Sequence, residues 1–132
     1  MQASLEGRMR SLYEGSCGDS EGDGKAIREI LARIGDKWSL LVIGTLSLGP
    51  LRFTALQQHI PGVSQRMLTL TVRQLERDGL LTRTAYAEVP PRVEYELTSM
   101  GATLIGPASE LAKWAIEHRP AITLARQDFD AR

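Results

Sequence analysis

The 132-residue chain is predicted to form one mainly α-helical domain with a small β-hairpin, an α+β fold. Apolar residues recur at helical spacing as far as Leu75, alternate with polar ones between 81 and 97, and return to helical spacing after Thr98. Composition divides the chain into a mobile N-terminal arm at 1–24, a folded domain at 25–119 and a C-terminal tail at 120–132.

The overall composition is that of a soluble globular protein, with 42% hydrophobic and 24% charged residues. No apolar run is long enough to cross a membrane, and the first 16 residues lack the apolar block of a secretory signal. A single cysteine excludes an intrachain disulfide. We therefore expect a cytoplasmic protein.

The first two helices are expected on either side of Gly35. A helix begins at about Lys25, because apolar residues follow at helical spacing: Ile27, Ile30, Leu31 and Ile34. Asp36 can cap a second helix, which Gly49 and Pro50 end. This second helix is apolar on nearly every side, so it is expected to be buried.

A helix-turn-helix pattern follows. A short helix presents Phe53, Leu56 and Ile60 on one side and closes at a turn, Pro61-Gly62-Val63. Ser64 can then cap a longer helix that ends before Gly79. In this second helix Leu68, Val72 and Leu75 share one face and are expected to enter the core.

The alternating segments at 81–86 and 93–97 predict the two strands of the hairpin, joined by a tip that two prolines stiffen. Thr98 is expected to begin a final helix, which Pro107 should kink near its second turn. Its apolar stripe is Leu104, Ala108, Leu111 and Ala115. Residues 120–132 have no clear period and are expected to trail off.

This order of elements is that of a winged helix-turn-helix. At these spacings the sequence resembles the HxlR family of bacterial transcriptional regulators, relatives of the MarR-type winged-helix proteins. The resemblance covers 34–114 and rests on five ordered blocks: GDKWSLL at 35–41, GPLRF at 49–53, PGVSQRML at 61–68, LERDGL at 75–80 and YAEVPPRVEYELT at 86–98. It implies a sequence-specific DNA-binding regulator, expected to be a repressor. The homodimer would place a recognition helix in the major groove and the wing on the minor groove or the backbone.

The middle third of the chain is the basic one, because residues 50–93 carry six arginines against three acidic residues. Arginine suits phosphates and guanine edges, and glutamine can pair with adenine. The residues expected to contact DNA are Arg52, Ser64, Gln65, Arg66, Thr69, Arg73 and Arg92. A solvated helix face is the alternative for such charges, and it is the preferred interpretation of Arg77.

Arg92 and an apolar residue of the recognition helix, Leu70, each have open alternatives. Arg92 can reach the minor groove or a phosphate, or it can form a salt bridge with Glu88 or Glu94. Leu70 lies on the polar side of the recognition helix, where it can touch a thymine methyl group or lean on the neighbouring helix. A winged helix can also serve as a protein-interaction module without DNA binding, but such a module has no need of this cluster of arginines.

Two apolar edges predict a homodimer, and in the family that the sequence resembles the flanking N- and C-terminal helices make the dimer contact. The expected interface residues are Ile27, Ile30, Ile34, Leu104, Ala108, Leu111 and Ala115. An unidentified small-molecule effector can be accommodated between these helices and the DNA-binding half. No catalytic motif, metal-ligand spacing or phosphate-binding loop is present, so neither an enzyme nor a cofactor is indicated.

Cys17 is the candidate redox residue. Members of the resembled family that sense oxidants or electrophiles commonly carry a cysteine about a dozen residues before the Lys-Trp pair, a place that falls near Lys25 here. Cys17 lies eight residues further upstream, and no basic residue beside it favours the reactive thiolate. We therefore expect a bystander thiol, with a redox switch as the alternative.

Overall fold

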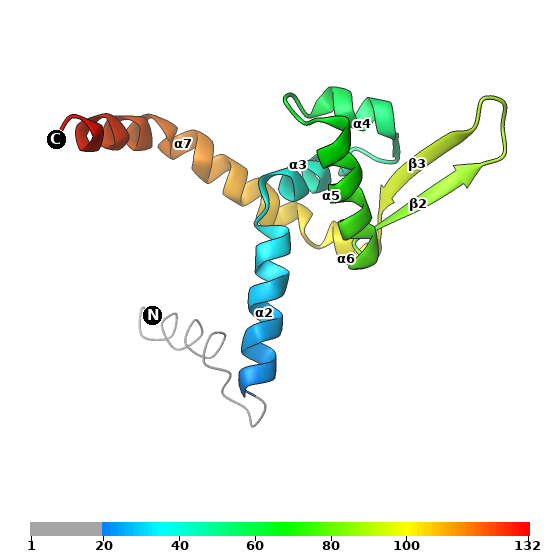
Figure 1. The fold of residues 1–132 in the computed structure, drawn as a ribbon, viewed down its shortest axis with the longest axis horizontal. Helices are drawn as coiled ribbons and strands as arrows, with labels where there is room; N and C mark the ends of the chain where they lie inside the picture. The colour runs from blue at the N-terminus through cyan, green and yellow to red at the C-terminus, as the bar shows by residue number, and fades with distance from the viewer. Residues whose placement is uncertain (1–19) are drawn as a thin grey trace.

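The computed structural model describes residues 20–132, and its helices and strands extend in three directions from a small core (Figure 1). The hairpin projects on one side, the C-terminal helix on the opposite side, and the N-terminal helix away from both (Figure 1). The elements in chain order are α2 (Ser20–Ile34), α3 (Lys37–Leu46), β1 (Leu51–Arg52), α4 (Phe53–His59), α5 (Gln65–Arg77), β2 (Leu81–Tyr86), β3 (Arg92–Leu97), α6 (Ser99–Ala102) and α7 (Ile105–Asp130).

Helix α3 forms the centre of the core, as its apolar composition predicted. The Asp36 side chain caps it by accepting a hydrogen bond from the Ser39 amide at 3.3 Å. Val42 and Ile43 are fully buried among side chains from α4, α5 and the start of β2. The remaining buried apolar residues of this core are Leu46, Leu56, Ile60, Val63, Leu68, Val72, Leu75, Leu80, Leu81 and Tyr95.

The sheet has three antiparallel strands in the order β1-β3-β2, one more than the sequence predicted. Leu51 and Arg52 pair with Tyr95 and Glu94, which fixes the start of α4 to the base of the hairpin. A strand of two residues is too short to display an alternating pattern, so sequence periodicity could not reveal it.

The N-terminal boundary is corrected by five residues, because α2 begins at Ser20 rather than at about Lys25. Extending an existing helix adds one hydrogen bond for each residue fixed, so a nucleated helix can continue into a sequence of low propensity. The glycines of the 20–24 segment weaken the helix without breaking it. The rest of the expected arm, residues 1–19, lies outside the described residues.

The expected C-terminal tail is wrong, because α7 continues through residue 120 to Asp130. Pro120 lies inside this helix, where it removes one backbone donor but does not end it. The predicted kink at Pro107 is also wrong. Thr98 caps only the short helix α6, and α7 starts afresh at Ile105, so Pro107 lies in a first turn whose N–H groups need no helical partner.

Candidate nucleic-acid interface

Helix α5 is the second helix of the helix-turn-helix, and both of its ends are fixed. Ser64 caps the amino end, its Oγ accepting a hydrogen bond from the Met67 amide at 3.0 Å. Gly79 follows the carboxyl end with a φ of 77°, a backbone conformation that favours glycine. The face formed by Leu68, Thr71, Val72 and Leu75 is buried, and α5 packs against α3 and β2. The helix therefore presents one defined face to solvent.

That outer face carries a row of four side chains at helical spacing, Arg66, Leu70, Arg73 and Arg77. All four are exposed. Within residues 24–132, whose side chains the structure describes, none of the three arginines forms an ion pair. Their guanidinium groups are therefore available to an anionic partner.

The first two turns of α5 add polar groups beside this row. Gln65 and Thr69 are exposed, and the Thr69 hydroxyl donates a hydrogen bond to the Gln65 carbonyl oxygen at 2.8 Å. Its lone pairs remain free to accept a further bond. The predicted set Ser64, Gln65, Arg66, Thr69 and Arg73 is thus brought together on one exposed surface.

Arg52 lies at the amino end of α4, where it is the residue before the first helical position. Its side chain is exposed and makes no capping hydrogen bond. The backbone N–H groups of the first helical turn point toward the same end and favour negative charge there. This geometry is suited to holding an anionic group such as a phosphate.

The structure favours the salt-bridge alternative for Arg92. Its guanidinium lies 3.1 Å from Glu88 Oε1 and 3.6 Å from Glu94 Oε1, and it stacks over the Tyr86 ring at 4.1 Å from the centroid. The side chain is only 26% exposed. Arg92 therefore braces the hairpin rather than extending from it.

Sequence reasoning missed Arg83 as a wing residue with a free charge. It lies on β2 opposite Tyr95, is exposed, and has no ion pair among the described side chains. Nothing in the alternating pattern distinguished it from Arg92, because both were arginines of the same hairpin. The acidic residues nearby in the sequence could have distinguished the two arginines. Arg92 has Glu94 two positions away and Glu88 four positions away, which indicates a salt bridge, whereas Arg83 has no acidic residue within four positions.

The predicted interface residues divide into two groups. Leu104 packs against the core and Ala108 is only 8% exposed, so both belong to the chain's own packing. Ile30 and Leu111 are 56% and 52% exposed, while Ala115 is also exposed and Ile27 and Ile34 are half-buried. The same two helices expose further large apolar side chains: Leu31, Trp114, Ile116, Leu124 and Phe129.

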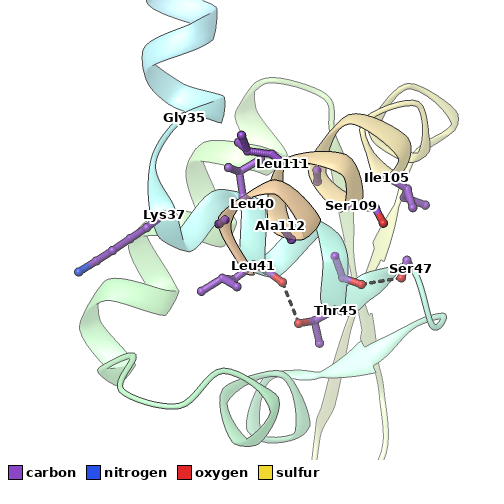
Figure 2. A pocket seen from close by; sticks show the side chains of 13 residues that line it. Gly35, Lys37, Leu40, Leu41, Thr45, Ser47, Ile105, Ser109, Leu111 and Ala112 are labelled. Atoms are coloured by element: carbon purple, nitrogen blue, oxygen red, sulfur yellow. Dashed lines mark hydrogen bonds between the residues drawn. The ribbon is translucent and has the colours of Figure 1, made fainter. Parts of the chain in front are cut away.

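A groove of about 660 Å³ lies between α3 and the first half of α7 (Figure 2). Leu40 and Leu41 line it from α3, and Ile105, Leu111 and Ala112 line it from α7. It lies where the sequence suggested room for an effector, beside the DNA-binding half. Most of its lining is apolar, so it suits an apolar surface better than an anion.

The described residues do not meet the requirements of a metal site or of a membrane-spanning helix. No group of three metal-ligating side chains occurs among them, and no described helix is long and apolar enough to cross a membrane. Cys17 lies outside the described residues.

Comparison with known proteins agrees with this architecture. A family model described as HxlR-like helix-turn-helix matches residues 33–123. An HTH-type transcriptional regulator of Methanothermobacter thermautotrophicus is 45% identical over 105 residues, covering 77% of this chain and 80% of its own. The structure of the transcriptional regulator YtfH from Salmonella typhimurium is 36% identical with a TM-score of 0.70, covering 76% of this chain and 89% of its own.

A second solved structure, that of the redox regulator HypR in its reduced form, is also 36% identical, with a TM-score of 0.67. The similarity covers 74% of this chain and 97% of that one. The family model spans more than half of the chain, including the helix-turn-helix, the hairpin and most of α7. The chain therefore belongs to the HxlR-like helix-turn-helix family of transcriptional regulators.

Proposed function

We propose that this regulator is a sequence-specific repressor that binds operator DNA as a homodimer. The observation that carries the proposal is the outer face of α5, where Arg66 and Arg73 are exposed and have no ion pair among the described side chains. A helix held rigidly at both ends can enter the major groove with such a face toward the bases. A repressor of this kind would act by occupying the promoter.

The proposed contacts fall into two kinds. Arg66, Gln65, Thr69 and Arg73 lie in the first turns of α5, the part of a recognition helix that reaches base edges. Arg52 and Ser64 lie at helix amino ends and are proposed to hold phosphates, which set register and orientation. Arg92 remains a wing residue near the DNA, and its proposed part is to hold the wing in shape.

The proposed dimer uses α2 and α7. Their exposed apolar side chains, Ile30 and Leu31 on one and Leu111 and Trp114 on the other, would be costly to leave in water. Leu111 also lines the groove between α3 and α7 (Figure 2). A two-fold partner would place the two recognition helices about 34–36 Å apart, one turn of DNA.

Paired arginine variants test the DNA-binding proposal. On an operator selected from random DNA, Arg66→Ala should cost about 1–3 kcal/mol and relax discrimination at one or two base pairs. Arg52→Ala should weaken binding to all DNA sequences alike. It should also reduce the slope of log affinity against log salt concentration by roughly the contribution of one phosphate contact. Arg119→Ala, an exposed arginine of α7, is the control and should bind as the parent does.

The competing function is a protein-interaction module without DNA binding. If the purified parent shows no salt-dependent binding to any DNA, the proposed function is wrong and the interaction module replaces it. If the parent binds and both variants bind equally tightly while remaining folded, the outer face of α5 is a solvated surface.

Sedimentation tests the dimer independently of DNA. Trp114→Ser together with Leu111→Ser should convert a dimer at micromolar concentration into a monomer, because both substitutions remove exposed apolar area from α7. Val89→Ser, which changes a fully exposed residue of the wing tip, should leave the mass unchanged. A parent protein that sediments as a monomer with and without DNA would contradict the dimer.

A further inference from the structure

Leu70 is an apolar residue at the centre of a cationic surface. It follows Arg66 by four residues and precedes Arg73 by three, so all three side chains lie on one face of α5. That face is opposite the buried one, and Leu70 is 48% exposed. Burying its exposed surface would be favourable by the usual hydrophobic free energy.

Leu70 is not part of the apolar packing around the core. The half-buried apolar side chains that pack against the core are Trp38, Leu51, Phe53, Val93, Leu97, Leu104 and Ile105, and Leu70 is not among them. Contact with a neighbouring helix can account only for the covered part of its surface, because 48% of the side chain is exposed. Leu70 is available to whatever contacts the arginines beside it.

Only one group in the major groove matches this chemistry. The bases present hydrogen-bond donors and acceptors there, and thymine alone adds an apolar group, its C5 methyl. A leucine between two arginines would meet that methyl while the flanking guanidinium groups bind guanine edges or phosphates. We propose that Leu70 is a specificity-determining residue that contacts the methyl group of a thymine in each half-site.

This inference rests on the proposed function and adds a position-specific chemical requirement to it. Its test uses the parent protein and its selected operator, with each thymine replaced in turn by deoxyuridine, which lacks only the methyl group. Loss of one buried methyl contact is expected to weaken binding roughly fourfold, following the transfer free energy of one such group. The loss should occur at one thymine in each half-site.

A variant cycle assigns the effect to Leu70. Leu70→Ala should weaken binding to the thymine operator by a similar factor and should show no further loss with deoxyuridine at that position. Leu48→Ala, another exposed leucine that lies after α3, is the control and should keep the parent's full sensitivity. Random-DNA selection with Leu70→Gln provides a second measurement, in which the thymine preference should disappear from that position.

The outcomes separate the two proposals. If the parent binds no DNA, the proposed function itself fails. If the parent binds but no deoxyuridine substitution weakens it, or if Leu70→Ala and Leu70→Gln keep the same thymine dependence as the parent, the role of Leu70 is wrong while DNA binding stands.

Discussion

Arg33 and Asp78 connect the N-terminal helix to the end of the recognition helix. Arg33 Nη1 lies 3.2 Å from Asp78 Oδ2 and donates a longer hydrogen bond, 3.5 Å, to the main-chain oxygen of Gln74. Asp78 is the C-cap of α5, where the partial negative charge of the helix end favours a cation. The last turn of α2 is therefore tied to the helix that we propose reads DNA.

Removing this connection should lower stability modestly. The two side chains are 26% and 38% exposed, so solvent screens them, and Arg33→Ala should reduce the free energy of unfolding by roughly 0.5–1 kcal/mol. Urea denaturation of Arg33→Ala, Asp78→Asn and the double variant measures the coupling between the residues. The double variant should lose less than the sum of the single losses.

The control for this cycle is Arg28→Ala, an exposed arginine of α2 that has no ion pair among the described side chains. It should leave stability nearly unchanged. Strictly additive losses from the Arg33 and Asp78 substitutions would show that the two side chains do not interact in solution.

The bracing of the wing by Arg92 leads to a second prediction. Arg92→Ala removes two ion pairs and the stack on Tyr86, interactions worth on the order of 1 kcal/mol together at a partly exposed site. Backbone amides of β2 and β3 should then exchange hydrogen about five times faster, while those of α3 and α5 keep their protection. Hydrogen exchange followed by mass spectrometry measures both regions at once.

Arg83→Ala is the matched control, because it removes an arginine from the same hairpin without breaking an ion pair seen among the described side chains. Its strand protection should equal that of the parent. Equal exchange in the parent and in Arg92→Ala would mean that the guanidinium does not hold the wing.

Features that depend only on residues close together in the chain were predicted correctly from the sequence. The cap at Ser64, the buried face at Leu68 and Val72, and the end of the helix before Gly79 are all decided within a few residues, and the structure confirms them. The element order and the family followed from these local signals taken together.

Prediction from the sequence was wrong or incomplete where the structure depends on residues far apart in the chain or on the continuation of a helix. The pairing of Arg52 with Glu94 depends on a strand that follows two helices and another strand in the chain, so no local period can report it. Whether Arg92 faces DNA or pairs with its acidic neighbours could be decided only from the distances between its guanidinium and the Glu88 and Glu94 carboxylates. Residues 120–132 show no clear apolar period, yet they are helical up to Asp130, because extending a helix already formed is easier than starting a new one.

The contact between α6 and Leu80, the residue before β2, leaves no room for a side chain at Gly101. A Cβ atom at Gly101 would lie 1.9 Å from the main-chain oxygen of Leu80, which also accepts a hydrogen bond from the Thr98 amide at 3.1 Å. Gly101→Ala must therefore displace backbone, and it should cost at least about 2 kcal/mol of the free energy of unfolding.

Gly106 supplies the control for this substitution. A Cβ there meets no atom within 4 Å, and Gly106→Ala should be neutral or stabilise α7 by up to about 1 kcal/mol. Thermal unfolding of the two variants beside the parent measures both effects. A melting temperature for Gly101→Ala as high as that of Gly106→Ala would contradict the close packing of α6 on Leu80.

The final prediction concerns Cys17, the chain's single cysteine. Its reactivity depends on the thiolate, which positive neighbours stabilise, whereas the nearest charged residues in the sequence are Glu14 and Asp19. Cys17→Ser should therefore respond to a thiol oxidant as the parent does, with operator affinity unchanged in both when measured by fluorescence anisotropy. The family resemblance alone does not predict sensing, because the sensing cysteine is expected near Lys25, where this chain has none.

Non-reducing electrophoresis of the same samples provides an independent readout, since one cysteine in each chain allows only an intermolecular disulfide or a small adduct. The prediction is that any disulfide-linked dimer forms without a change in DNA affinity. If oxidant releases the parent from its operator and the serine variant stays bound, Cys17 is a redox switch. The N-terminal segment that carries it would then be part of the regulatory mechanism.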